Sequence, residues 1–407
     1  MNTQTPSGSP VEAPARHYDV VVIGGGVMGS ATAWHLLAQA PGLSVAVIEP
    51  EPSYAEAASS TASGGVRQLF SRPENVLMSR YTHEVINSWA DWTPPSGAAE
   101  PEEVPDLGWR PNGYLFITER SLSDQLRADF EQQVELGVEA VWMEPEDIED
   151  RYPLIATHDL GPAVLSPRDG WLAPSLLLDG MMRRSRRLGA VFLRDRAVGF
   201  DQKGRRLTGV QLESGRVLSG DHFVNVAGVW GPALSAQLGL TLPVEPMRRF
   251  DHYVEVPMSF ADYPFIKDPQ GLAIRPEGKG LTAALVDFST PAGWDLSIDK
   301  TWFDEVVWPA LAARIPQADQ VRLISTWSGH YDINRLDGQM ILDRWDAELD
   351  NYYFATGFSG HGLMHAPAVG RALAELILHG SFQTLDLERM GLGRVLSGEP
   401  YRELTVR

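Results

Sequence analysis

A glycine-rich turn between two apolar runs constrains the fold of this chain more than any other feature. Gly24, Gly26 and Gly29 follow the apolar run 20–23 in the spacing G-x-G-x-x-G, and a helix pattern and a second apolar run come next. This order predicts strand, tight turn, helix and strand, with the positive end of the helix facing a phosphate. Glu49 lies twenty residues after Gly29, where a carboxylate can accept a hydrogen bond from a ribose hydroxyl. The stretch therefore predicts an adenine dinucleotide site, and the alternative is a glycine-rich turn in an ordinary α/β unit.

Length, charge and cysteine content narrow the class of protein. The 407 residues exceed one typical core, so two domains are expected. A net charge of −19 disfavours nucleic acid or an anionic membrane as the main partner. Because there is no cysteine, disulfides, thiolate metal sites, a cysteine nucleophile and a flavin attached through cysteine are excluded.

The chain also lacks the sequence marks of a membrane or secreted protein. No apolar run approaches the roughly 18 residues that a membrane helix needs. Residues 1–16 are rich in proline and serine and contain no apolar core of a secretory signal. They are expected to form a disordered tail on a cytoplasmic protein.

The segment after the second strand is expected to lie beside the cofactor, because ligands of such folds bind where the strands end. Its hydroxyl groups can donate to a ligand, and two adjacent glycines permit close approach to a flat ring. Arg67 either forms a structural ion pair or stands beside the cofactor. The hydroxyl donors are Ser59, Ser60, Thr61 and Ser63, and the glycines are Gly64 and Gly65. Val27 and Met28 of the first turn are also predicted to contact the cofactor.

A second glycine loop decides between a nicotinamide and a flavin. A strand is predicted at 352–356, a loop at 357–362, and a helix from Pro367 to Leu378 with the proline in its first turn. A second helix N-terminus suits an isoalloxazine ring, because its dipole stabilises the anionic reduced ring. The sequence therefore favours FAD over NAD. His361 and His365 are four residues apart, but no third ligand is evident, so no metal site is predicted.

The remaining pattern predicts an α/β fold in which two domains interleave. A Rossmann-like FAD-binding domain of the glutathione-reductase-like type is expected from residues 17–90, 168–235 and 336–400. Residues 91–167 and 236–335 lack a βαβ rhythm and are expected to form an α+β substrate domain built on an antiparallel sheet. The apolar strand that begins at Phe223 ends in the small residues Ala227 and Gly228. The backbone at Ala227, Gly228 and Trp230 is therefore predicted to lie close to a ligand.

Several motifs in register resemble one family of flavoenzymes. They are DVVVIGGGVMGSATAWHLL, SSTASGGVRQLFSRPENVLMS, VNVAGVW and GFSGHGLMHAPAVGRALAEL, within roughly residues 18–400. The chain resembles the D-amino-acid oxidase superfamily of FAD enzymes, in the branch of glycine and sarcosine oxidases and dimethylglycine dehydrogenase. Within this branch, SGGVRQLFSRPEN and ATGFSGHG are most similar to the FAD-dependent oxidoreductase domain proteins that act as assembly factors of respiratory complex I.

The resemblance implies a noncovalent FAD in an extended pose. Gly24, Gly26, Gly29 and Glu49 would contact its ADP half, and the backbone of Val198 would contact the adenine. Ser60, Thr61 and Ser63 would contact the pyrophosphate and the ring. Tyr331 falls where the family has an aromatic hydroxyl in the substrate pocket. The implied reaction is hydride transfer from a carbon that bears an amine to flavin N5, and the resulting imine hydrolyses. The residues implied at the flavin O2 edge are Gly357, Ser359, Gly360, His361, Gly362 and Leu363.

Four positions depart from the sarcosine oxidase pattern. In sarcosine oxidases a lysine and an arginine hold the substrate carboxylate, and this chain has Met364 and Phe70 at those positions. It has Thr282 in place of the lysine that activates oxygen, and Gly329 in place of the cysteine that binds the flavin. A buried carboxylate without a cationic partner is too costly. Either another cation replaces these anchors or the substrate is not a simple amino acid. Three arginines are candidates for this anchor, with an ordinary ion pair as the alternative for each: Arg275, Arg248 and Arg249.

The expected function is oxidation of the C–N bond of an amine or amino acid, with secondary amines and N-substituted amino acids favoured. Tyr331, His361, Arg67 and Arg275 are the residues predicted around flavin and substrate. Oxygen or an electron-transfer partner would reoxidise the flavin, and the absence of a lysine at Thr282 favours the partner. The alternative is a binding protein and not an enzyme: an FAD-binding assembly protein whose main task is to bind a partner, with little turnover of its own.

Overall fold

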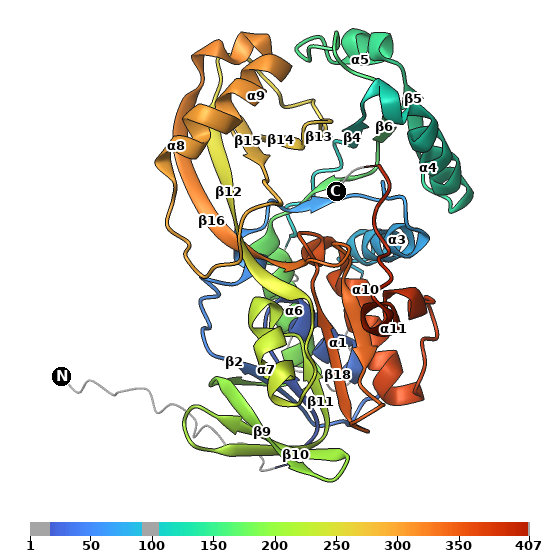
Figure 1. Cartoon of the computed structure of the whole chain (residues 1–407), viewed down its shortest axis with the longest axis vertical. Coiled ribbons are helices and arrows are strands. Elements are labelled where there is room, and N and C mark those ends of the chain that lie inside the picture. Colours follow the sequence, from blue (N-terminus) through green and yellow to red (C-terminus); the bar gives the residue numbers. More distant parts are fainter. Residues whose placement is uncertain (1–16, 92–105, 406–407) are drawn as a thin grey trace, which may run out of the picture.

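The computed structural model describes residues 17–91 and 106–405. Two eight-stranded sheets lie one above the other in Figure 1, and the chain passes between them several times. The predicted tail 1–16 lies outside the described residues. In the part of the chain that the structure describes, no helix combines the length and the apolar character needed to cross a membrane.

The first sheet is parallel at its centre and is built around strand β1. β1 (His17–Ile23) pairs in parallel with β2 (Val45–Glu49) on one side and with β11 (Val217–Asn225) on the other. Its residues are mostly apolar because both faces of the sheet are covered. Alternate residues enter two different apolar clusters, one on each face. The other strands of this sheet are β8 (Val191–Arg194), β9 (Ala197–Lys203), β10 (Arg206–Leu212), β17 (Ile341–Arg344) and β18 (Tyr352–Thr356).

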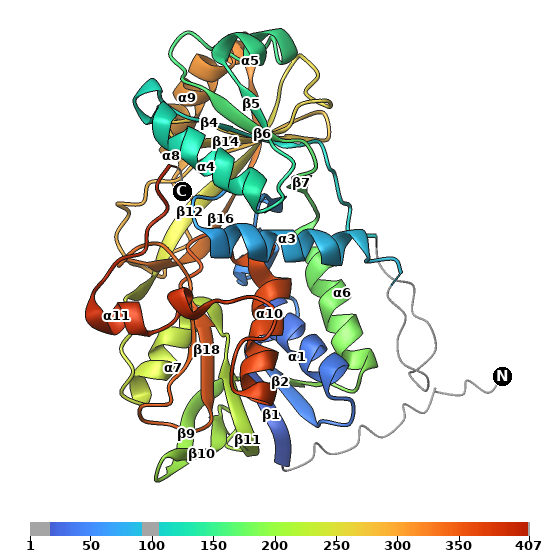
Figure 2. The same ribbon diagram turned by 90° about the vertical axis from the view of Figure 1, so that its right-hand side faces the viewer.

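Helices cover one face of this sheet. α1 (Val27–Gln39) packs between α6 (Pro174–Arg187) and α10 (Gly362–His379), and α3 (Pro73–Asn87) packs against α10 (Figure 2). The opposite face is covered by the β9–β10 hairpin and by α7 (Gly231–Gln237). A sheet covered on both sides leaves only its edges and strand ends for ligands.

The second sheet is antiparallel except at one pair. β13 (Phe265–Lys267) runs parallel to β4 (Tyr114–Ile117), and the other pairings of this sheet within the described residues are antiparallel. The longest pairing joins β12 (Val244–Glu255) to β16 (Arg322–Asn334). The remaining strands are β5 (Val141–Met143), β6 (Ala163–Ser166), β14 (Leu272–Glu277) and β15 (Gly280–Leu285). The two sheets confirm the predicted fold class.

Shorter elements flank and connect the sheets. The second sheet is flanked by α4 (Ser123–Glu135), α5 (Pro145–Arg151), α8 (Lys300–Trp302), a π-helical turn (Phe303–Val307) and α9 (Trp308–Arg314). The junction contains α2 (Ala58–Thr61), the small sheet of β3 (Gly65–Val66) and β7 (Gly170–Trp171), and the 3₁₀ turn Gly228–Trp230. The described chain further contains α11 (Gly393–Ser397) and the 3₁₀ turns Arg120–Leu122, Pro316–Gln320 and Glu388–Met390.

Helix α10 begins five residues earlier than predicted. The sequence pattern predicts Pro367 in the first turn, but the helix starts at Gly362 and contains this proline in its interior. The chain turns through Ser359 and Gly360, which have φ of 51° and 100°, and becomes helical almost at once. Pro367 has no N–H to donate to the carbonyl four residues earlier, that of Leu363. The early start places the N-terminus of α10 inside the predicted glycine loop.

Helices α1 and α10 cross closely at Gly370. A Cβ built on this glycine would lie 2.6 Å from the carbonyl carbon of Ala31 and 2.7 Å from the backbone nitrogen of Thr32. Backbone atoms cannot move aside as the end of a flexible side chain can, so the crossing requires glycine. The contact fixes the two helices relative to each other over a large part of their lengths.

We expect Gly370→Ala to lower the free energy of unfolding by about 1–3 kcal/mol, because the added methyl group forces the two helices apart. Urea denaturation measures the effect. Gly393→Ala is the matched control, since nothing lies within 4 Å of a Cβ at Gly393 in the described structure. Equal stability of the two variants would contradict the proposed steric constraint.

Candidate active site

A cavity of about 490 Å³ lies where the two sheets meet. Its walls come from the carboxyl ends of β1, β2 and β11, from the starts of α1 and α10, and from the inner face of the second sheet. This is the edge at which open α/β sheets bind ligands. The predicted cofactor residues that line it are Gly24, Gly26, Val27, Met28, Glu49, Ser63, Gly64, Gly65, Val198, Ala227, Gly228, Trp230, Ser359, Gly360, His361, Gly362 and Leu363.

The turn after β1 has the conformation that its glycines predict. Gly24 has a φ of 101°, and a Cβ there would lie 2.6 Å from the carbonyl oxygen of Val226. A Cβ on Gly29 would lie 1.8 Å from the carbonyl oxygen of Gly24, so the third glycine lets α1 pack against the strand. Gly26, at the N-cap of α1, provides no side-chain cap. An anionic ligand can take the place of a capping side chain at this helix end.

Glu49 ends β2 at the edge of the cavity. Its Oε2 accepts a hydrogen bond from the backbone N–H of Gly25 at 2.9 Å, and its Oε1 accepts one from the N–H of Glu51 at 3.0 Å. Burial raises the pKa of the Glu49 carboxyl above its usual value. The two N–H donors hold the carboxylate beside the glycine turn, and each oxygen retains a further lone pair for a ribose hydroxyl.

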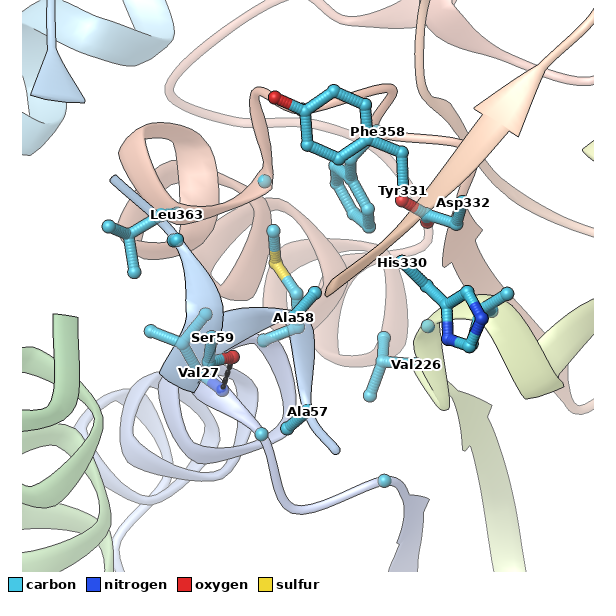
Figure 3. Close-up of a pocket in the computed structure, with 18 of the residues that line it drawn as sticks. Val27, Ala57, Ala58, Ser59, Val226, His330, Tyr331, Asp332, Phe358 and Leu363 are labelled. Carbon is cyan, nitrogen blue, oxygen red and sulfur yellow. Dashed lines mark hydrogen bonds between the residues drawn. The ribbon is translucent and has the colours of Figure 1, made fainter. Parts of the chain in front are cut away.

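The prediction of which α2 hydroxyl groups face the cofactor is corrected by the structure. Ser60 is exposed to solvent, and the side chain of Thr61 packs against Gly329, so neither lines the cavity. Ser59, which was predicted as a hydroxyl donor but is not among the residues that the resemblance assigns to FAD, does line it, and its Oγ accepts a hydrogen bond from the N–H of Val27 at 3.2 Å (Figure 3). One residue of error along a helical turn rotates a side chain by roughly 100°. The α2 hydroxyl that contacts the first turn of α1 is therefore that of Ser59.

Two adjacent glycines have a different role from the one expected. A Cβ on Gly64 would lie 2.2 Å from the carbonyl oxygen of Leu172, and one on Gly65 would lie 2.8 Å from the ring of Phe265. Both residues line the cavity, but contacts with the protein itself already exclude a side chain at these positions. These contacts explain why both positions are glycine, without the close approach of a flat ring that the sequence suggests.

The loop that leads into α10 is attached to the end of β16. Gly357 donates its N–H to Oδ2 of Asp332 at 2.8 Å, and Ser359 donates its N–H to the carbonyl oxygen of Asp332 at 3.2 Å. Asn334 donates its N–H to the hydroxyl of Ser359 at 3.0 Å. Burial raises the pKa of Asp332 to about 6. Gly357 itself faces Val244 and Asn334 and does not line the cavity, which corrects its predicted contact with the flavin.

Arg67, His361 and Tyr331 come together at the second-sheet end of the cavity. Nη2 of Arg67 lies 3.3 Å from Nε2 of His361, and Nη1 donates to the carbonyl oxygen of Leu69 at 3.1 Å. The ring of Tyr331 lies against Gly360, where a Cβ would be 2.7 Å from its Cζ. Tyr331 and His330 leave β16 in opposite directions, as alternation along a strand requires (Figure 3).

The three arginines considered as carboxylate anchors are all engaged elsewhere. Arg275 donates through Nε to the carbonyl oxygen of Ser63 at 2.8 Å and pairs with Glu277, and it does not line the cavity. Arg248 pairs with Asp295 at 3.0 Å. Arg249 lines the cavity but pairs with the buried carboxylate of Asp251. The prediction of Arg275 as a substrate-binding residue is therefore corrected, because its guanidinium is taken up by groups of the protein.

Residues 19–376 match the family described as DAO, FAD dependent oxidoreductase. The chain belongs to this family. It is 31% identical to FAD-dependent oxidoreductase domain-containing protein 1 of Xenopus laevis, over 99% of this chain and 87% of that protein. It is 25% identical to the mitochondrial sarcosine dehydrogenase of Homo sapiens, over 89% of this chain and 40% of that protein. The solved structure of L-proline dehydrogenase from P. horikoshii is similar with a TM-score of 0.81 and 25% identity, over 95% of this chain and 99% of that chain.

The FAD of this family fits the cavity. The N-terminus of α1, where Gly26 provides no cap and Ser59 binds the N–H of Val27, suits the ADP half together with the carboxylate of Glu49. The N-terminus of α10 lies at the wall formed by Gly362 and Leu363. Gly329 stands where a flavin-binding cysteine would be expected, and a Cβ there would lie 2.3 Å from Oγ1 of Thr61. The rings of His361 and His365 are 6.1 Å apart, and the described residues contain no group of three or more acidic, histidine or cysteine side chains placed to hold a metal.

Lys267 lines the cavity of this DAO-family protein, although it was not among the predicted site residues. Its strand, β13, is three residues long, too short for a clear periodic pattern. The available signal was the alternation in Phe265-Ile266-Lys267, which puts Lys267 on the same face as the cavity-lining Phe265. Tyr114 was also missed, and its ring stacks on Phe265 with centroids 4.5 Å apart.

The attachment of the glycine loop to β16 gives a pH-dependent prediction. The pKa of Asp332, about 6, is raised above the value of an unfolded carboxyl, so its contribution to stability is present at low pH and is lost as the pH rises through about 6. Asp332→Asn keeps an acceptor for Gly357 but cannot ionise. We expect the Tm of the wild type, relative to that of this variant, to fall between pH 5 and pH 8.

Asp332→Ala is the matched control, because it removes the acceptor for Gly357 and should lower the Tm at both pH values. Differential scanning fluorimetry across this range measures all three proteins. Parallel Tm curves for the wild type and Asp332→Asn would contradict the assignment.

Proposed function

We propose that this protein is an FAD-dependent oxidoreductase that oxidises the C–N bond of an amine or amino acid, with secondary amines and N-substituted amino acids as favoured substrates. The observation that carries the proposal is one cavity that extends from the glycine turn of β1–α1 to the inner face of the second sheet. Two relatives support the substrate class, since sarcosine dehydrogenase and L-proline dehydrogenase are named for amino acids with a secondary nitrogen.

Bound FAD would supply the two-electron acceptor for the hydride on the carbon next to the nitrogen, and the imine product hydrolyses in water. The turn at Gly24–Gly29 and Glu49 would hold the ADP half. The N–H groups at the start of α10 would stabilise negative charge at the far end of the cofactor. We propose that FAD is held noncovalently, because the chain has no cysteine and Gly329 leaves no space for one. Release of all the flavin on acid precipitation tests this.

The substrate end of the cavity favours an uncharged amine. A nearby ionised carboxylate would keep the nitrogen protonated and so oppose hydride loss. Asp332 is the cavity-lining carboxylate in this part of the described structure, and its Oδ2 is directed at the N–H of Gly357. Tyr331 lies against the glycine loop and carries a hydroxyl that can position the substrate.

Anaerobic mixing with a panel of compounds tests the proposal. The panel contains N-methyl amino acids, cyclic secondary amino acids, primary amino acids and secondary amines without a carboxylate. Loss of the oxidised flavin absorbance identifies a substrate without assuming an electron acceptor. Peroxide formation in air would then indicate an oxidase, and turnover only with an artificial acceptor would indicate a dehydrogenase. An unreduced flavin across the whole panel would contradict the proposal and favour an FAD-binding protein that acts through partners.

We expect Tyr331→Phe to slow flavin reduction by the best substrate about three- to tenfold, the effect of losing one neutral hydrogen bond. FAD content should be unchanged, because the ring that packs on Gly360 is retained. Stopped-flow absorbance measures the rate. Tyr253→Phe is the matched control, since Tyr253 lies on β12 and does not line the cavity. Unchanged rates in both variants would remove Tyr331 from the substrate site.

A further inference from the structure

Two cations in the cavity wall lack a carboxylate partner. Arg67 is 4% exposed, and its polar contacts are the carbonyl oxygen of Leu69 and the ring of His361. Lys267 is half-buried and donates from Nζ to the carbonyl oxygen of Gly271 at 2.9 Å. Neither forms an ion pair with any residue in the described ranges, whereas Arg249, the neighbouring cavity arginine, pairs with Asp251.

Sheet pairing brings these two cations to the same place. β13 pairs in parallel with β4, so that Lys267 lies opposite Phe116. The guanidinium of Arg67 stands over the ring of Phe116 at 5.0 Å and over that of Phe70 at 4.3 Å. Burial, together with the positive charge of Arg67, lowers the pKa of Lys267 to about 8. The two positive charges are therefore close enough to repel each other.

Their surroundings make this repulsion costly. The rings of Tyr114 and Phe116 attract the guanidinium of Arg67, which lies 5.8 Å and 5.0 Å from their centroids, but these rings carry no charge that could neutralise it. The charge of the adjacent Asp268 acts on Lys267 in the opposite direction, but this carboxylate forms its ion pair with Arg314. An anion between Arg67 and Lys267 would relieve both the remaining desolvation cost and the mutual repulsion. The ammonium group of Lys267 has three donors, and one of them is used by Gly271, so two remain for a ligand.

We propose that Arg67 and Lys267 together bind a carboxylate of the ligand, so that the substrate of the oxidoreductase proposed above is an amino acid and not a plain amine. Only the statement that this ligand is a substrate rests on the proposed function; the carboxylate site itself is argued independently. A carboxylate can accept one hydrogen bond from the guanidinium and another from the ammonium group. The pair would replace the anchors whose usual positions are occupied by Phe70 and Met364, and it would place the carboxylate against the β4–β13 part of the second sheet.

The test measures binding of a carboxylate that cannot be oxidised at nitrogen. Isobutyrate and isobutyramide have nearly the same shape but differ in charge, and isothermal titration of the FAD-loaded protein gives both dissociation constants. We expect wild-type protein to bind isobutyrate at least about tenfold more tightly than the amide. Lys267→Met should weaken isobutyrate binding by about tenfold or more and leave amide binding unchanged, and Lys267→Arg should restore most of the loss.

Lys203→Met provides the matched control, because this lysine is exposed at the end of β9 and does not line the cavity. It should bind both ligands as the wild type does. Equal affinity of the wild type for isobutyrate and isobutyramide would overturn the proposal, and so would unchanged isobutyrate binding in Lys267→Met. The first comparison stands even if Lys267→Met fails to retain FAD.

The outcomes separate this inference from the proposed function. Isobutyrate binding that depends on Lys267, with no flavin reduction by any compound of the panel, would contradict the oxidoreductase proposal and leave the carboxylate site intact. Flavin reduction by amines that lack a carboxylate, at rates equal to those of the matching amino acids, would contradict the carboxylate site and leave the oxidoreductase function intact.

Discussion

The close crossing of α1 and α10 at Gly370 is the constraint on which the site depends. Each helix starts at the same cavity, one after the glycine turn of β1 and the other after the loop that follows β18. Their N-termini can serve the two ends of one extended cofactor only if the helices keep a fixed spacing. Backbone-to-backbone contact with Ala31 and Thr32 provides that spacing, because it is far less compressible than a contact between side chains.

Charge is distributed unequally along the cavity. At the glycine turn, Glu49 contributes a carboxylate held by two backbone N–H groups. At the opposite end, Arg67 and Lys267 contribute positive charge, and the neighbouring Asp332 is directed into the glycine loop. This arrangement suits a ligand with sugar hydroxyls at one end and an anion at the other. An anion at that end would neutralise Arg67 and Lys267, which form no ion pair with a carboxylate among the described residues.

Local sterics made part of the site predictable from the sequence. The spacing of Gly24 and Gly29 specifies a turn whose requirements lie within a few residues, so the first turn was predicted in detail. The choice of Ser60 over Ser59 failed because composition does not determine which side of a short helical turn faces the ligand. Arg275 and Lys267 depend on longer-range geometry: one is engaged by Ser63, and the other is positioned by the parallel pairing of β13 with β4. Alternation along β13 predicts the face on which Lys267 lies, but it does not predict which strand pairs with β13.

Strand β16 has a consequence for access to the cavity. It carries Tyr331 on the second sheet, and its last residues hold the loop between β18 and α10 through Asp332 with Gly357 and through Asn334 with Ser359. Swinging the second sheet away from the first would break these bonds and detach the loop from the start of α10. A hinge between the sheets is therefore an expensive way to admit a ligand. Movement of connecting segments that carry none of these bonds is the expected route for substrate and product.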